Sequence, residues 1–538
     1  MGYIEGARRE QQMMFPATVD EYVGENNEVR AVAAFIECLR FDELGFVRSE
    51  PAVEGRPGYD PRVLLAIYIW GHLNRIRSSR RLERECGRNV ELMWLSGLLR
   101  PDFKTLCRFR QENTEAIGKV LVEFRLLCDR AGLFGKELVA IDGSKFKAVN
   151  STDRNVTQKK LAAMIERERR AVQEYLAELE KADTQDQGSG SDLTADELKN
   201  KIVQLEVHLK EHEHLLAEMK ESGEKQRSLT DPDARLMKTA KGTHVCYNVQ
   251  TAVDSKHKLI VEVEVTNEAA DQTLLAEMAR KAKHGLGLQE LTVVADGGYF
   301  SNDALKACED ENITAYVPIR EAQDAERKGL FSRKRFKYDE ARDLYVCPEQ
   351  AEMTPTSKGV KKSPRTSWEF LLYTTRACAG CPVRSQCTSS KTGRTIRRWV
   401  HHAVLDRLQA RLDENPDIIR KRKALVEHPF GTIKIAMGHE RLLTKGIANV
   451  ATEIKLTVLG YNFKRVLSIL GLETLIAMIK SREFDVQRAQ NSLLRPKHAQ
   501  NLLFGPKRNV IRDHYISWLN FSWLRKNICF VQKLRAIA

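Results

Sequence analysis

An alternation of β-prone and helical segments between residues 137 and 319 is the feature that most constrains the fold. Strand patterns occur at 137–142, 244–253, 259–266, 291–296 and 313–319. The second and third patterns form a hairpin across residues 254–258, and helical patterns separate the last three. The sequence therefore predicts a mixed α/β sheet in the order strand, hairpin, helix, strand, helix, strand.

Helical patterns occupy much of the remaining chain. Residues 1 to about 135 and 404–470 are predicted to be helical, and so are two segments within 157–219. The Gly/Ser connector 184–191 joins these two segments, and Thr194 with Glu197 makes a capping box for the second. That segment carries a heptad stripe of Leu198, Ile202, Leu205, Leu209, His212, Leu216 and Met219. We expect an antiparallel helical hairpin in which His212 is a seam residue and not a metal ligand.

These patterns divide the chain into parts. We predict a helical N-terminal domain at 1–135, in which basic residues cluster between Arg75 and Arg110 and favour DNA binding. The first part of the sheet core follows at 136–320, with the hairpin inserted at 155–225. Residues 321–402 are basic, irregular and cysteine-bearing, and we interpret them as a second insertion. The helical part of the core follows at 403–480, and a basic tail covers 481–538.

The charge balance favours an anionic partner. The chain has 87 Lys and Arg against 73 Asp and Glu, which gives a net charge of +14 with neutral histidines. Its longest apolar run, Val63–Trp70, is far shorter than the ~20 residues of a membrane-spanning helix, so we expect a cytoplasmic protein without a membrane partner. The candidate DNA contacts are Arg75, Arg77, Arg80, Arg81, Lys145 and Lys147. A solvated charged surface explains the same residues about equally well.

Three acids lie at predicted element ends. Asp142 and Asp296 each close a strand before a glycine, and Glu427 lies on or beside the first turn of a later helix. Converging carboxylates are the ligands that Mg²⁺ or Mn²⁺ needs, and two such ions ~3.5–4 Å apart commonly serve phosphodiester chemistry. Each acid alone is more simply a turn or capping residue, but their order along the chain favours a metal site. Because clustered carboxylates repel one another, we expect a raised pKa for at least one of them without metal.

Four of the eleven cysteines form a C-x30-C-x2-C-x5-C pattern in the basic insertion: Cys347, Cys378, Cys381 and Cys387. Four thiolates could bind a structural Zn²⁺ and so fold a segment that has no strong core pattern. Ordinary reduced thiols are the alternative interpretation, because the segment contains a single Cys-x2-Cys pair.

Several longer motifs resemble the DDE transposases of bacterial insertion sequences, which are RNase H-like enzymes, and most closely the branch named after insertion sequence eleven-eighty-two. They are Met1–Gly6, Gly58–Arg62, Ser79–Arg84, Val139–Ser144, Asn248–Asp254, Val294–Tyr299 and Val426–Thr432, and the likeness covers about residues 1–480. The resemblance implies an RNase H-like fold for the sheet core. It also implies that Asp142, Asp296 and Glu427 are the catalytic metal ligands and that Lys434 contacts DNA near the cut.

The resemblance further implies the reaction and its partners. Two Mg²⁺ or Mn²⁺ ions would support cleavage of double-stranded DNA at terminal inverted repeats, and the freed 3′-hydroxyl would then attack target DNA. Pairing of two ends implies a homodimer or higher oligomer, located in the cytoplasm of a bacterium and on its nucleoid when bound to DNA. Two alternatives stay open: an RNase H-like nuclease without strand transfer, and a transposase-derived DNA-binding protein that no longer cuts.

Overall fold

The computed structural model describes residues 18–48, 57–150, 154–184, 195–239, 241–319, 329–362 and 367–481. The Met1–Gly6 motif, most of the Gly/Ser connector, Thr194 of the expected capping box and nearly all of the basic tail lie outside these residues. Among the described residues, no helix combines the length and the apolar composition that crossing a membrane requires.

The N-terminal part consists of helices. They are η1 (Val19–Tyr22), α1 (Val29–Cys38), α2 (Phe41–Leu44), α3 (Pro61–Leu73), α4 (Ser79–Glu85), α5 (Val90–Leu95), α6 (Phe103–Glu112) and α7 (Thr114–Arg130). Asp60 caps helix α3: its side chain accepts a hydrogen bond from the Arg62 amide at 2.8 Å, and Pro61 occupies the first helical position. Nearly all of α3 is buried, because the long helix α16 (Ile447–Leu470) packs against both α3 and α7.

A buried ion pair joins α16 to the loop before α4. The Arg77 guanidinium lies 2.9 Å from Glu453 Oε1 and donates to the carbonyl oxygens of Arg441 at 2.9 Å and Gly438 at 3.1 Å. The Arg77 and Glu453 side chains are only 11% and 4% exposed. Arg77 is thus engaged within the chain, whereas the neighbouring Arg81 is exposed.

We expect Arg77→Ala to lower the free energy of unfolding by about 3 kcal/mol, because it leaves the Glu453 carboxylate buried without its cation. Urea unfolding followed by tryptophan fluorescence measures the change. Arg81→Ala removes an exposed cation of the same region and should change stability by less than about 0.5 kcal/mol. Equal stabilities for the two variants would show that the pair does not hold these helices together.

A six-stranded mixed sheet forms the centre of the chain. Its strands are β1 (Val139–Lys147), β4 (Arg235–Thr239), β5 (Gly242–Asp254), β6 (Ile260–Thr266), β7 (Leu291–Val294) and β8 (Ile313–Tyr316). The order is β4-β5-β1-β7-β8, and β6 also pairs with β5. Strands β1, β7 and β8 are parallel, whereas β5 is antiparallel to β1, β4 and β6. The prediction of a mixed α/β fold is confirmed.

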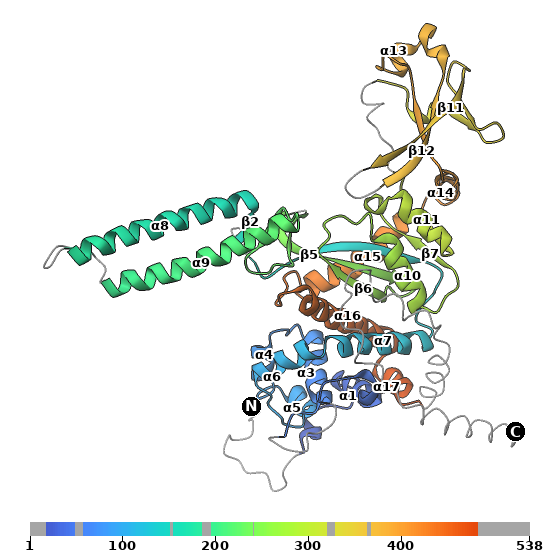
Figure 1. Cartoon of the computed structure of the whole chain (residues 1–538). Helices are drawn as coiled ribbons and strands as arrows, with labels where there is room; N and C mark the ends of the chain where they lie inside the picture. Colours follow the sequence, from blue (N-terminus) through green and yellow to red (C-terminus); the bar gives the residue numbers. More distant parts are fainter. Residues whose placement is uncertain are drawn as a thin grey trace, which may run out of the picture. The chain divides into compact units, whose positions relative to one another are not determined.

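Helices cover both faces of this sheet (Figure 1). Helix α15 (Ile418–Gly431) packs on one face, where Val426 contacts a buried cluster that includes Ala140 and Val294. Helix α10 (Leu275–Gly285) packs on the sheet, and α11 (Asn302–Asp310) connects β7 to β8. The remaining helical elements near the core are α14 (Ala403–Glu414), η6 (Thr432–Ala436) and α17 (Leu472–Lys480).

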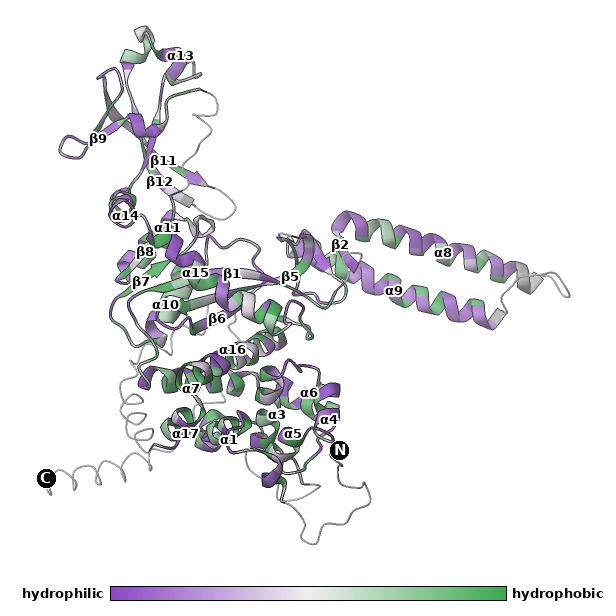
Figure 2. Ribbon diagram, turned by 180° about the vertical axis from the view of Figure 1, so that it is seen from behind, coloured by the Kyte–Doolittle hydropathy of each residue, from purple (hydrophilic) through white to green (hydrophobic). Residues whose placement is uncertain are grey.

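Two long helices leave the sheet between β1 and β4. Helices α8 (Gln158–Thr184) and α9 (Ala195–Glu221) pack against one another, and the short strands β2 (Asn155–Thr157) and β3 (Gln226–Ser228) pair beside them. His212 lies in the seam with its Nδ1 atom 3.0 Å from the Glu168 carboxylate. Figure 2 shows mainly hydrophilic residues along both helices and hydrophobic ones in α1, α3 and α16.

The cysteine-bearing segment forms a second sheet. Its five antiparallel strands are β9 (Lys337–Asp339), β10 (Leu344–Val346), β11 (Glu352–Lys362), β12 (Ser367–Thr374) and β13 (Ile396–Trp399). The expectation of irregular structure here is therefore wrong. The lysines of β11 interrupt the alternation that marks a strand. One of them, Lys361, places its Nζ atom over the ring of Trp368 on β12, 5.8 Å from the ring centroid.

Candidate active site

Asp142 lies in the middle of β1 and not at its end, which corrects the expectation from the Asp-Gly pair. Its partner on β5 is Thr251, and its Oδ1 accepts a hydrogen bond from the Gly143 amide at 2.9 Å. Gly143 is required for packing: a Cβ atom there would lie 2.2 Å from Gln250 Nε2 and 3.0 Å from Asp271 Oδ1. The glycine therefore makes room for side chains on the opposite face of the sheet and does not form a turn.

Asp296 follows β7 and caps the short 3₁₀ helix η3 (Gly297–Tyr299). Its Oδ1 accepts a hydrogen bond from the Gly298 amide at 2.7 Å, and a Cβ atom on Gly298 would lie 2.7 Å from the same oxygen. Ala140 pairs with Val294 across the parallel strands β1 and β7. Asp142 and Asp296 each come two residues later, so both carboxylates lie on the same face, just beyond the residues where β1 and β7 pair.

Arg422 of α15 contacts both carboxylates. Its Nη2 atom lies 2.7 Å from Asp142 Oδ1 and 3.6 Å from Asp296 Oδ2. Burial raises the pKa of Asp142, Arg422 and the Gly143 amide oppose the shift, and the Asp296 charge adds to it. The expected direction of the shift is confirmed, but burial and not repulsion is its largest cause.

Glu427 lies near the end of α15, because this helix begins at Ile418. The expectation of a first-turn position is wrong: Pro429, which favours a helix start, here lies inside the helix. The Glu427 side chain is 65% exposed, and Lys423 Nζ lies 3.7 Å from its Oε1. In the part of the chain that the structure describes, no three His, Cys, Asp or Glu side chains form a group that could hold a metal ion.

A divalent ion fits two of the three predicted ligands. Asp142 and Asp296 present carboxylate oxygens to a single cationic group, which is the donor set that hard ions prefer. In this structure the positive charge that faces the two carboxylates is the guanidinium of Arg422. For Glu427 to join the pair, its side chain must leave Lys423.

Lys434 of η6 contacts strand β1, the strand that carries Asp142. Its Nζ donates to Ser144 Oγ at 2.6 Å and to the Lys145 carbonyl oxygen at 2.8 Å, above the Phe146 ring. Burial lowers the pKa of Lys434 to about 8. Further along β1, the Nζ atom of Lys147 lies 3.8 Å from Glu440 Oε1.

The predicted arginines lie near η6. Arg75, Arg77 and Arg81 line a cavity of about 340 Å³ together with η6 residues that include Ile435, whose side chain is 84% exposed. Arg80 lies over the Phe103 ring at 4.9 Å. The structure thus brings three of the four arginines beside the segment that carries Lys434.

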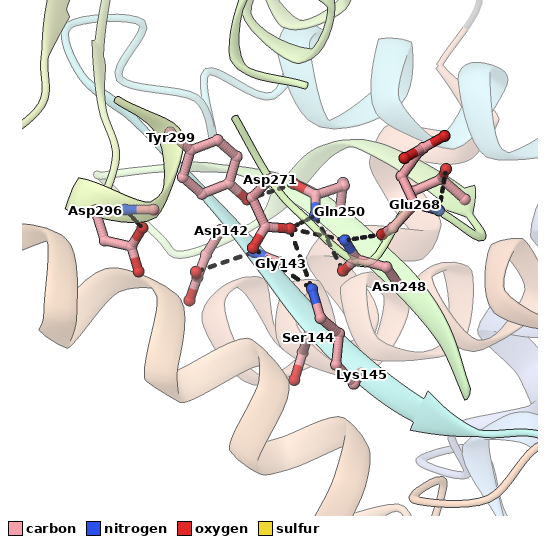
Figure 3. Close-up of polar contacts among 12 residues, drawn as sticks. Asp142, Gly143, Ser144, Lys145, Asn248, Gln250, Glu268, Asp271, Asp296 and Tyr299 are labelled. Carbon is pink, nitrogen blue, oxygen red and sulfur yellow. Dashed lines mark hydrogen bonds and ion pairs between the residues drawn. The ribbon is translucent and has the colours of Figure 1, made fainter. Parts of the chain in front are cut away.

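The sequence patterns did not predict a polar network that lies on the face of β1 opposite to Asp142 (Figure 3). The Asp271 carboxylate accepts hydrogen bonds from Asn248 at 2.7 Å, Gln250 at 2.8 Å and Lys145 at 3.2 Å. The Gln250 side chain in turn accepts a hydrogen bond from Tyr299, which ends the turn that Asp296 begins. The network therefore connects Lys145 to the Asp296 turn, and no local pattern marks these contacts, because they join distant segments.

Comparison with known families places two regions of the chain. Residues 346–467 match a family model described as a transposase DDE domain, and residues 17–112 match a transposase domain known as DUF772. These matches support a DDE transposase. The DDE match includes Arg422, Glu427 and Lys434, but it begins after Asp142 and Asp296 and so includes neither of them.

A solved structure and the curated proteins add little to this assignment. One solved structure that the chain is similar to is a cryo-EM piggyBac transposase synaptic complex with hairpin DNA. It is 10% identical, with a TM-score of 0.29, over 92% of this chain and 89% of that one. A score this low establishes no shared fold. No curated protein matches the chain.

Proposed function

We propose that this transposase cuts DNA at the ends of a mobile element and joins the freed ends to target DNA. The observation that carries the proposal is the pair of carboxylates, Asp142 and Asp296, held side by side beneath the cation of Arg422. In the proposal both aspartates bind Mg²⁺ or Mn²⁺, and Glu427 completes the site after leaving Lys423. Two such ions, when bound, would activate the attacking oxygen and stabilise the leaving oxygen.

We propose further that the central sheet is an RNase H-like core. Its support is the strand order β6-β5-β1-β7-β8, in which β1, β5 and β6 are antiparallel neighbours and β7 and β8 continue parallel to β1. In this proposal α8 and α9 are one insertion, residues 321–402 are another, and the helices up to residue 135 form the DNA-binding domain. The kinship to the eleven-eighty-two branch and the bacterial, cytoplasmic origin belong to the same proposal.

The basic side chains around η6 support DNA as the partner. Arg75 and Arg81 line the cavity beside η6, and Arg80 is exposed nearby. Lys434 directly precedes Ile435, which also lines this cavity, and its Nζ atom contacts Ser144 of β1. Cations spaced along one surface bind the phosphate backbone without reading its sequence. In the proposal Arg77 supports DNA binding only indirectly, because its hydrogen bonds to the carbonyl oxygens of Gly438 and Arg441 hold the segment after η6 in place. In the proposal, at least two copies of the chain hold the two DNA ends together.

The test incubates the purified chain with Mg²⁺ and plasmid DNA that carries the element's two ends. We expect cleavage at both ends and products in which those ends are joined to new DNA. Cleavage without joined products would favour the nuclease alternative, and binding without cleavage would favour the non-catalytic DNA-binding protein. Either result would overturn the proposal.

Lys434 gives the proposed DNA contact a pH dependence. Because burial lowers its pKa to about 8, the ammonium is charged below pH 8 and loses its proton as the pH rises through that value. We expect DNA affinity to fall by about three- to fivefold more between pH 7 and pH 9 in the wild type than in Lys434→Met. Fluorescence anisotropy of labelled DNA at constant ionic strength measures the affinity at each pH. Parallel pH curves for the two proteins would exclude a phosphate contact of Lys434.

A further inference from the structure

We propose that the second sheet carries a structural zinc site formed by Cys347, Cys378, Cys381 and Cys387. The four residues come from three separate segments and line one cavity of about 250 Å³. Four thiolates in tetrahedral arrangement are a common closed ligand set for Zn²⁺. This proposal is independent of the proposed DNA chemistry, because the site lies in the connections between the strands of the second sheet and uses no residue of the carboxylate pair.

Two of the cysteines begin similar tight turns. In the first turn, the Gln350 amide donates to the Cys347 carbonyl oxygen at 2.9 Å, and the Ala351 amide donates to Cys347 Sγ at 3.3 Å. In the second, the Arg384 amide donates to the Cys381 carbonyl oxygen at 3.3 Å. Backbone amides that point at sulfur orient a thiolate and stabilise its charge, as outer-shell hydrogen bonds do in metal sites.

The other two cysteines are positioned by close packing. Gly393 has a positive φ of 96°, and a Cβ atom on it would lie 2.8 Å from Cys378 Cβ and 3.2 Å from its Sγ. Only glycine allows this approach, so the backbone holds Cys378 at the cavity wall. Cys387 ends α13 (Arg384–Cys387) and is 8% exposed, where it joins the small apolar cluster of this sheet.

A partly buried arginine lies beside the four cysteines. Arg394 lines the same cavity and donates to the Cys387 carbonyl oxygen at 3.2 Å. Its Nε atom is buried and has no hydrogen-bond partner among the described residues. A Zn²⁺ ion with four thiolates carries a net charge of −2, which this guanidinium would partly neutralise.

The size of the local core explains why a metal would matter here. The apolar cluster of the second sheet has six buried members: Phe336, Tyr345, Met353, Tyr373, Cys387 and Ile396. A core this small contributes little stability, and small modules often gain the remainder from a structural metal. No three described ligands are preassembled, so binding would draw the thiols inward around the cavity.

The experiment measures zinc in the full-length chain purified under reducing conditions without chelator. We expect about one zinc per chain by plasma mass spectrometry, and loss of most of it in Cys381→Ser. Cys38→Ser is the matched control: Cys38 ends α1, donates to the Phe35 carbonyl oxygen and should leave the zinc content unchanged.

A second measurement avoids dependence on the folding of the variant. Adding a strong chelator to the wild-type chain should release zinc and, in step with it, expose about four additional thiols to a thiol reagent. Replacing zinc with Co²⁺ should give the visible absorption bands of a tetrahedral thiolate site. A wild-type chain without zinc, or a Cys381→Ser variant that retains it, would overturn the proposal.

Discussion

Asp142→Asn should reduce Mg²⁺-dependent cleavage by at least about 10³-fold, equivalent to ~4 kcal/mol of transition-state stabilisation, while DNA affinity stays within about twofold. The substitution keeps the size of the side chain and the acceptor for the Gly143 amide, but it removes the charge that a dication requires. Asp142 is the more confined of the two aspartates, at 21% exposure against 47% for Asp296. Initial rates of strand nicking on an end-containing duplex give the change.

Asp303→Asn is the matched control for this loss. Asp303 is an exposed acid in the first turn of α11 and should leave cleavage unchanged. Thermal unfolding of both variants separates loss of the reaction from loss of the fold. Wild-type cleavage by Asp142→Asn would show that the proposed site is wrong.

Arg422→Ala should change both stability and metal binding. Without metal, the variant leaves Asp142 and Asp296 facing one another without a cation, which we expect to cost about 2 kcal/mol after allowance for partial exposure. With metal, the same change removes a competing positive charge, so Mn²⁺ should bind on the order of tenfold more tightly, or ~1.4 kcal/mol. The variant should therefore gain more thermal stability from added Mn²⁺ than the wild type does.

Arg420→Ala tests whether the effect is specific to this arginine. Arg420 lies two residues earlier on α15, is 89% exposed, and its Nη1 atom lies 3.4 Å from Asp417 Oδ1. We expect neither its stability nor its response to Mn²⁺ to differ from the wild type. If Arg422→Ala behaves in the same way as Arg420→Ala, the guanidinium does not neutralise the carboxylate pair.

The two aspartates could be found from sequence because each is marked by its neighbours. Apolar runs predicted β1 and β7, and an acid followed by glycine singled out Asp142 and Asp296. The expected role of Gly143 at the end of a strand was nevertheless wrong. Gly143 is required by Gln250 and Asp271, which lie more than a hundred residues away in sequence, and no local pattern reports such a contact.

Glu427 and Arg422 show where local reasoning fails. Pro429 suggested a helix start, but α15 continues through it, so Glu427 lies near the helix end. Arg422 stands in a run of four basic residues, 420–423, and nothing in the sequence distinguishes the one that turns toward the sheet. Its role depends on packing between α15 and β1, which only the tertiary structure provides.

The most direct test of the carboxylate site replaces Asp142 with a softer ligand. Asp142→Cys should lose cleavage in Mg²⁺, which binds sulfur poorly, and recover part of it in Mn²⁺, which accepts sulfur more readily. Asp303→Cys should cut equally well with either ion. Recovery confined to Mn²⁺ would identify Asp142 as a metal ligand, and equal activity of Asp142→Cys in both ions would contradict the account.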